Sequence, residues 1–266
     1  MTNFLIICLA LISLSNAYAA EIQYKDVRQD LNGVDIPCLT IEGKIEYGDY
    51  RKLQNLINQN PELFAIAGAH IALDSNGGDF VEALKIGALI KSMPTWIMVQ
   101  NKCASSCFFL YVAGAFRHTG LAGQLGVHRP FFDARYFRKL NTRQAEIQQK
   151  KLFHEASKYL EDSSVPNSLQ EVVFNTPSTY VKWLNPDQTR LLGMMSPSFW
   201  ELALARCQLK DVSEIKSQTE HTEWIIKLRD CSNKLMDDER QRVISEAIEA
   251  SKRNKSSVAI ELLSAR

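Results

Sequence analysis

Apolar residues in the middle of the chain alternate between short runs and stretches with helical spacing. The short runs predict strands over residues 34–41, 70–73, 95–99 and 125–127. Apolar residues three to four positions apart predict helices over residues 47–58, 80–92 and 108–112. Strands that alternate with helices are typical of an α/β fold with a parallel sheet and crossover helices.

The remainder of the chain predicts mainly helices. Residues 136–162 are polar and contain neither Gly nor Pro, so we expect a long helix there. Near the C-terminus, apolar residues with helical spacing stand among many charges. The sequence therefore predicts an α/β domain over residues 20–205 and a helical extension over residues 206–266.

The N-terminal segment has the pattern of a secretory signal peptide over residues 1–19. Residues 4–14 are apolar apart from Ser13, and Ala17 and Ala19 supply small side chains at the two positions that a signal peptidase reads. The run is too short to span a membrane, which takes roughly 20 apolar residues. We expect export to the periplasm or the extracellular space, with no membrane span left after the signal is removed. Lipidation of Cys8 is disfavoured, because the bulky Ile7 precedes it.

The charge balance and the hydrophobic fraction of the chain bear on its binding partners and on whether it folds. The chain has 31 Lys and Arg residues against 30 Asp and Glu residues, which gives a net charge of +1. Nucleic-acid binding depends on clustered cations, so this balance argues against a nucleic-acid partner. A hydrophobic fraction of 45% supports a packed core and argues against intrinsic disorder.

Export changes how the cysteines are interpreted, because an oxidising compartment favours disulfides. Cys207 and Cys231 could join helices of the C-terminal extension. Cys103 and Cys107 are four residues apart, so a helix would bring them within bridging distance. Buried thiols are the alternative, and Cys38 is expected to be one. No second cysteine pair has ligand spacing, so we expect no metal site.

Candidate chemistry lies where predicted strands end, because loops at the carboxyl ends of parallel strands form binding sites. Gly77 and Gly78 follow one strand and let the backbone approach a ligand closely. Ser105 follows the next strand at the start of a helix, where a serine is often only a cap. His128 ends a later strand. Together these residues supply the amides, nucleophile and base of acyl-transfer chemistry.

The motifs that contain these residues resemble those of Clp-type serine proteases, within the Clp/crotonase superfamily. The resemblance covers residues 35–130 well and residues 131–196 more thinly, and its motifs are Asp74-Ser75-Asn76-Gly77-Gly78, Cys103-Ala104-Ser105-Ser106-Cys107, Ala113-Gly114 and His128-Arg129-Pro130.

Each candidate residue takes a role from this resemblance. Ser105 matches the nucleophile and His128 the base, and the backbone amides of Gly78 and Ser106 match the oxyanion hole. Ser105 is preferred to Ser106, because its distance to Ala113-Gly114 fits the pattern.

The resemblance also carries expectations for the whole chain. It implies a core of repeated β-β-α units, a handle-like helix within residues 136–162, a homo-oligomer, and peptide or unfolded protein as substrate. It implies no cofactor.

The chain departs from the family at the acid of the catalytic triad. Residues 177–182, which precede Trp183-Leu184, contain no carboxylate. Ser178 or Thr179 could orient His128 through a neutral hydrogen bond. One remaining alternative is an acid from elsewhere in the chain, such as Asp162 or Asp187. The other is a Ser-Lys dyad like that of signal peptide peptidase A, for which the candidates are Lys150, Lys151 and Lys182.

Three hypotheses follow for the function. The first is an exported Clp-like serine peptidase that uses a Ser105–His128 dyad. The second is a catalytically inactive relative that binds peptides or a partner protein, and the missing acid motivates it. The third is a crotonase-type acyl-CoA enzyme, which export disfavours because acyl-CoA chemistry is normally intracellular.

Overall fold

The structure is a computed structural model that describes residues 19–28, 35–61, 63–64, 70–132 and 134–253. Apart from Ala19, the predicted signal peptide lies outside the described residues, as does the end of the predicted C-terminal extension.

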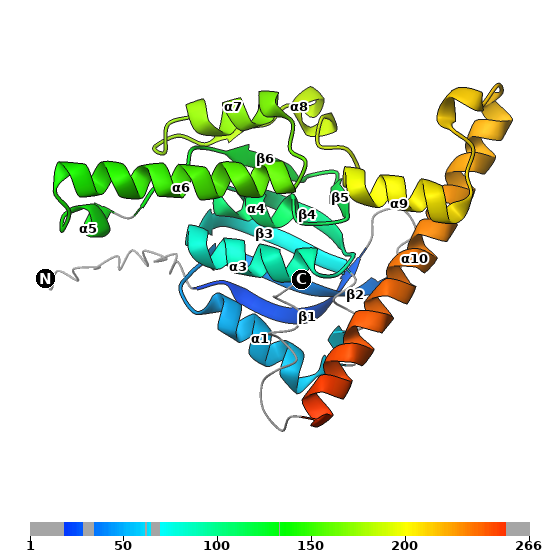
Figure 1. Ribbon diagram of the computed structural model, residues 1–266, viewed down its shortest axis with the longest axis horizontal. Coiled ribbons are helices and arrows are strands. Elements are labelled where there is room, and N and C mark those ends of the chain that lie inside the picture. Colours follow the sequence, from blue (N-terminus) through cyan, green and yellow to red (C-terminus); the bar gives the residue numbers. More distant parts are fainter. Residues whose placement is uncertain (1–18, 29–34, 62, 65–69, 133, 254–266) are drawn as a thin grey trace, which may run out of the picture.

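One sheet of seven strands forms the centre of the described part of the chain (Figure 1). Its strands are β1 (Glu21–Arg28), β2 (Asp35–Ile45), β3 (His70–Gly78), β4 (Trp96–Ala104), β5 (Phe116–Thr119), β6 (Gln124–Val127) and β7 (Lys182–Trp183). The order is β1-β2-β3-β4-β6-β7, and β5 pairs with β4 beside this path. The interior pairs are parallel, whereas β1 and β7 run antiparallel to their neighbours. The predicted α/β class and mostly parallel sheet are confirmed.

Helices connect and cover these strands. They are α1 (Asp49–Gln59), α3 (Phe80–Lys91), α4 (Ser106–Tyr111), α5 (Ala134–Phe137), α6 (Thr142–Asp162), α7 (Asn167–Asn175), α8 (Pro186–Arg190), α9 (Pro197–Cys207), the 3-10 turn η1 (Val212–Glu214) and α10 (Gln218–Arg253). Figure 1 shows α3 and α4 against the sheet, α6 across one end of the molecule and α10 along the opposite side.

The main core lies between the interior strands and the helices next to them. Residues of β2, β3 and β4 and the apolar faces of α3 and α4 are almost fully buried; they include Leu39, Ile41, Leu73, Ile97, Val99, Ile86, Leu89, Phe108 and Leu110. Strands with both faces covered have few polar positions, which explains the short continuous apolar runs in the sequence.

Several elements are longer or shorter than the sequence predicts. The strand expected over residues 70–73 continues to Gly78, because a register shift between Leu73 and Ser75 keeps the turn-forming residues in the sheet. The long helix expected over residues 136–162 is divided into α5 and α6. A new helix begins after Asn141, whose side chain accepts a hydrogen bond from the Gln144 amide in a capping box.

The C-terminal helices pack at the amino ends of the strands. Trp224 and Leu228 of α10 share a second buried cluster with Phe199 of α9 and Phe116 of β5. Trp96, the first residue of β4, stacks on Phe116 with ring centroids 4.2 Å apart and joins the same cluster. The carboxyl ends of the strands therefore lie away from α10.

A disulfide between Cys207 and Cys231 fastens α9 to α10. Replacing both cysteines with serine should lower the free energy of unfolding by about 3 kcal/mol, because the bridge restricts a loop whose ends are 24 residues apart. Urea unfolding of the oxidised wild type and of the Cys207→Ser/Cys231→Ser variant measures this difference. Coincident unfolding curves would contradict the stabilising role.

Candidate active site

Ser105 occupies a sharp turn between the end of β4 and the start of α4. Its φ is 58° and its ψ is −126°, a backbone conformation that residues other than glycine rarely adopt. The Ser105 amide donates a hydrogen bond of 2.9 Å to the carbonyl of Gly126 in β6, which fixes the turn to the neighbouring strand. Strained residues of this kind cluster at functional sites when their surroundings hold them in place. Ser105 makes no side-chain capping bond to its helix, so its hydroxyl is not used as a cap.

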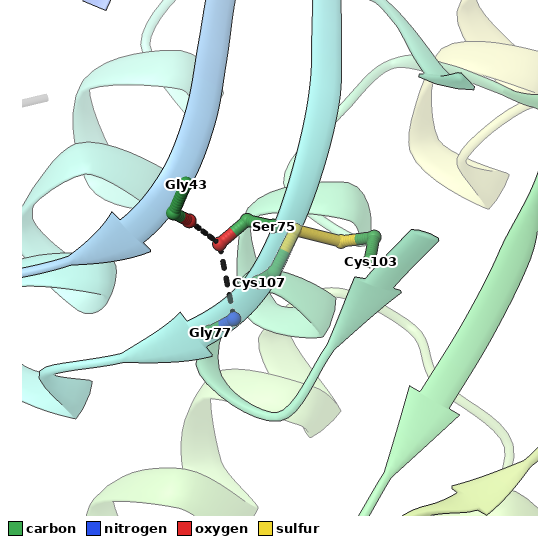
Figure 2. Close-up of a disulfide and its surroundings, with 5 residues drawn as sticks. All are labelled: Gly43, Ser75, Gly77, Cys103 and Cys107. Carbon is green, nitrogen blue, oxygen red and sulfur yellow. Dashed lines mark hydrogen bonds between the residues drawn. A yellow bond between two sulfur atoms is a disulfide. The ribbon is translucent and has the colours of Figure 1, made fainter. Parts of the chain in front are cut away.

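A second disulfide encloses this turn. Cys103 and Cys107 are bonded, with Cα atoms 5.2 Å apart, so the end of β4 is tied to the first turn of α4 (Figure 2). Both cysteines are fully buried. The bridge restrains the chain on both sides of Ser105.

The end of β3, the strand next to β4, is held by Ser75. This residue is buried and lies opposite Cys103 in the sheet. Ser75 Oγ donates to the carbonyl of Gly43 and accepts a 3.0 Å hydrogen bond from the Gly77 amide (Figure 2). This pair of bonds fixes the glycine turn at the end of β3 beside the Ser105 turn.

Gly77 and Gly78 are needed because two segments of backbone meet here. Gly77 has a φ of 86°, and a Cβ placed on it would lie 2.5 Å from the Ala104 carbonyl oxygen and 2.7 Å from Ser105 Cβ. Gly78 has a φ of 150°, and its Cβ would lie 2.0 Å from the carbonyl oxygen of Ile45. Only glycine fits at either position, so the predicted close approach of the backbone is present.

His128 follows β6 directly and is buried, with 8% of its surface exposed. Its Nδ1 lies 2.9 Å from the carbonyl oxygen of Arg129. Because a carbonyl oxygen can only accept a hydrogen bond, Nδ1 carries the proton and the lone pair of the neutral ring lies on Nε2. The Arg129 amide donates to the carbonyl of Thr176 at 2.9 Å, so this peptide group is itself held. A backbone carbonyl therefore makes the contact that a triad acid makes elsewhere.

Ser105 and His128 line one open cavity of about 630 Å³ together with Gly78. A second cavity of about 520 Å³ adjoins it and shares Lys44, Gly78 and Phe131 with it. Within the described residues, no hydrogen bond joins the Ser105 hydroxyl to the His128 ring. The structure thus brings the predicted nucleophile and base to one cleft without a direct bond between them.

Ser106 is placed differently from Ser105. It is buried, and it lines a narrow crevice that it shares with His128, Ser105 and Gly78. Its Oγ has no hydrogen-bond partner among the described residues. Its backbone amide is the first of α4 and therefore has no intrahelical acceptor. Ser105 lines the open cavity, whereas Ser106 lines the crevice beside it.

The other predicted candidates do not line the cleft. Ser178 is half-buried and Thr179 is exposed, and neither bonds to His128 in the described part of the chain. Asp187 is exposed and pairs with Arg190 at 2.9 Å. Three further candidates are exposed, namely Lys150, Lys151 and Lys182. Asp162 lines a different cavity.

Several lining residues were not expected from the sequence. They come from β1 and the residues just before it, from β2 and from the loop after β6, and they are Ala19, Glu21, Glu42, Lys44 and Phe131. Ile22 and Tyr24 alternate with polar residues and were the only signal for β1.

Among the described residues, no group of three or more His, Cys, Asp or Glu side chains could hold a metal ion.

The different cavity, of about 500 Å³, lies between α3, β5 and α9. Arg117 is buried there and donates hydrogen bonds to four backbone carbonyls, those of Gly114, Leu192, Val112 and Ser163. Lys91 Nζ lies 4.2 Å from the centroid of the Tyr159 ring. Burial lowers the pKa of Lys91 to about 8, although nearby Asp162 raises it and Arg117 lowers it further.

No protein-family model matches the chain, and no curated protein sequence matches it. Among solved structures, the chain is similar to a ClpP1 mutant from Listeria monocytogenes. The two share 15% identical residues with a TM-score of 0.45, over 59% of this chain and 86% of the other. Searching the described residues for a helix long and apolar enough to cross a membrane finds none.

Gly48 and Gly77 both have a positive φ, but only Gly77 lies against other backbone. Alanine at each position therefore distinguishes the cost of backbone strain from the cost of crowding. Gly48 has a φ of 99°, with nothing within 4 Å of an added Cβ, whereas Gly77 would place a Cβ against Ser105. Gly48→Ala should cost about 1–2 kcal/mol of stability from backbone strain alone. Gly77→Ala should cost about 1–3 kcal/mol more, because backbone atoms must shift. Urea unfolding of both variants checks this, and equal losses would contradict the close approach.

Lys91 predicts a pH-dependent stability. Its pKa is lowered from 10.5 in an unfolded chain to about 8, so between these values the unfolded chain binds a proton that the folded chain has released. Stability should therefore rise as pH increases from about 8 toward about 10. Lys91→Met should remove this rise, and Lys151→Met, on the exposed face of α6, should retain it. Urea unfolding across this pH range measures the slope; an unchanged slope in Lys91→Met would contradict the assignment.

Proposed function

We propose that the protein is a serine peptidase that cleaves peptides in the cleft between β3, β4 and β6. The observation that carries this proposal is that Ser105, in its strained turn, and His128, with its lone pair on Nε2, line the same open cavity. A nucleophile and a base that share a cleft are the minimum for acyl transfer. The sequence resemblance to Clp-type serine proteases assigns the same two residues the same roles.

The reaction would proceed through an acyl-enzyme. Ser105 Oγ forms a bond to the carbonyl carbon of the peptide while its proton moves to His128 Nε2. The C–N bond then breaks, and the departing amine takes that proton. Water attacks the resulting ester with His128 again as the base, which releases the acid and restores Ser105.

Backbone amides would stabilise the charge that develops on the carbonyl oxygen. The Ser106 amide, which has no intrahelical acceptor, and the Gly78 amide flank the Ser105 turn. Donors fixed in advance stabilise an oxyanion because they need no reorganisation during the reaction. This supports the assignment of Gly78 and Ser106 to the oxyanion hole.

The Arg129 carbonyl would replace the triad acid in orienting His128. It fixes the tautomer through Nδ1, as an acid would, but it carries no negative charge to stabilise the imidazolium. We therefore expect slower catalysis than a complete triad gives. Short or unfolded peptides in an exported compartment are the proposed substrates, and assembly into a homo-oligomer remains a prediction.

A second candidate function is peptide binding without hydrolysis. It is favoured by the absence, within the described residues, of a hydrogen bond between Ser105 and His128. In a peptidase, such a bond is often long before substrate binds and shortens in the complex.

A serine-directed fluorophosphonate probe tests the peptidase proposal. Ser105→Ala should abolish labelling, and His128→Ala should slow it by about 100-fold or more, because proton transfer in the transition state is lost. Ser178→Ala and Thr179→Ala should remain within about threefold of the wild type, since the Arg129 carbonyl holds the ring. Labelling that persists in Ser105→Ala would refute the proposal, and no labelling of the wild type would favour the binding function.

A further inference from the structure

The residues from Cys103 to Cys107 form a closed loop with the candidate nucleophile at its centre. Cys103 is the next-to-last residue of β4, and Cys107 is the second residue of α4. The disulfide joins these two ends, and Ser105 lies midway between them (Figure 2). A change at either cysteine therefore reaches Ser105 through a single intervening residue.

The backbone at the centre of this loop needs to be held in place. Ser105 has a φ of 58°, and residues other than glycine keep such a conformation only where their surroundings impose it. Its amide is bonded to the Gly126 carbonyl, and Gly77 packs against it. The disulfide adds a covalent restraint that joins the two sides of the turn.

Reduction of the bridge would move this loop without unfolding the domain. Two thiols need more room than a disulfide, because non-bonded heavy atoms stay about 3.5–4 Å apart. Both cysteines are fully buried, so this room has to come from movement of the segments that the bridge joins. β4 is also held by its pairing with β3 and β6, and Phe108 and Phe109 anchor α4 in the core. The strained turn between β4 and α4 would therefore take up the movement.

We propose that the oxidation state of the Cys103–Cys107 pair controls the candidate site, with Ser105 positioned for attack only when the pair is oxidised. This inference rests on the proposed peptidase function. In the oxidation, the two thiols give two electrons and two protons to the disulfide of a thiol–disulfide exchange partner, which becomes two thiols. The site is then incomplete in a reducing compartment and complete in an oxidising one. Both cysteines are positioning residues, since they act on the cleft through Ser105.

A variant without the second bridge isolates this control. The full chain with Cys207→Ser/Cys231→Ser is equilibrated at different ratios of reduced to oxidised dithiothreitol, and fluorophosphonate labelling is timed. Alkylation and mass spectrometry measure the thiol content of Cys103 and Cys107 in the same samples. Reduction should slow labelling by about 10-fold or more, because a small misplacement of a nucleophile is costly, and both measurements should share one midpoint potential. A labelling rate that stays constant while the pair becomes reduced would overturn the proposal.

The chain with Cys103→Ala/Cys107→Ala is the matched control, because it keeps the bridge between α9 and α10. It should label slowly at every dithiothreitol ratio and show no midpoint. Labelling as fast as that of the oxidised wild type would overturn the proposal. So would a midpoint that persists in this chain, since it would assign the redox response to the other bridge.

Amide exchange separates this inference from the proposed activity. The Ser105 amide is bonded to the Gly126 carbonyl at 2.9 Å, and Ala72 is fully buried within β3. Reduction should speed hydrogen exchange of the Ser105 amide at least about 10-fold, measured by NMR, and leave that of Ala72 unchanged. Faster exchange at Ser105 without labelling of either form would refute the peptidase and keep the redox control of the turn. Unchanged exchange at Ser105, or equal acceleration at Ala72, would refute the redox control alone.

Discussion

The close contact between two backbone segments at the ends of β3 and β4 determines where the candidate groups lie. Gly77 packs so tightly against the Ser105 turn that no side chain fits between them. Ser75 holds this glycine through its hydroxyl, and the Cys103–Cys107 disulfide holds the other segment. This contact sets the backbone positions of Gly77, Gly78 and the Ser105 turn relative to one another before any ligand binds.

The histidine is oriented by a different kind of group. A carboxylate would contribute both a direction and a negative charge, whereas the Arg129 carbonyl contributes the direction alone. The orientation does not depend on side-chain rotamers, because the acceptor is backbone that is itself bonded to Thr176. A change of side chain cannot remove this acceptor, although a shift of the backbone could.

The sequence predicted the candidate site residues that lie at the carboxyl ends of strands. Gly78, Ser105 and His128 each follow a run of apolar residues, and parallel strands bring such positions to one edge of a sheet. What could not be predicted depends on packing between distant segments. Nothing near His128 in the sequence indicates that the next carbonyl orients its ring. β1 was missed because its alternation is short and interrupted by Asp26, and the contribution of Glu21 to the cleft was missed with it.

The two ends of the sheet limit how copies of this protein could join. β1 is one edge strand, and Lys25 on it pairs with Glu42 at 2.8 Å, which places charges along that edge. Charged edges oppose the addition of a foreign strand. The opposite edge, β7, has only two residues and is too short to act as a template. Addition of a foreign strand at β1 or at β7 is therefore disfavoured, which favours helices and loops as the contact surfaces between copies.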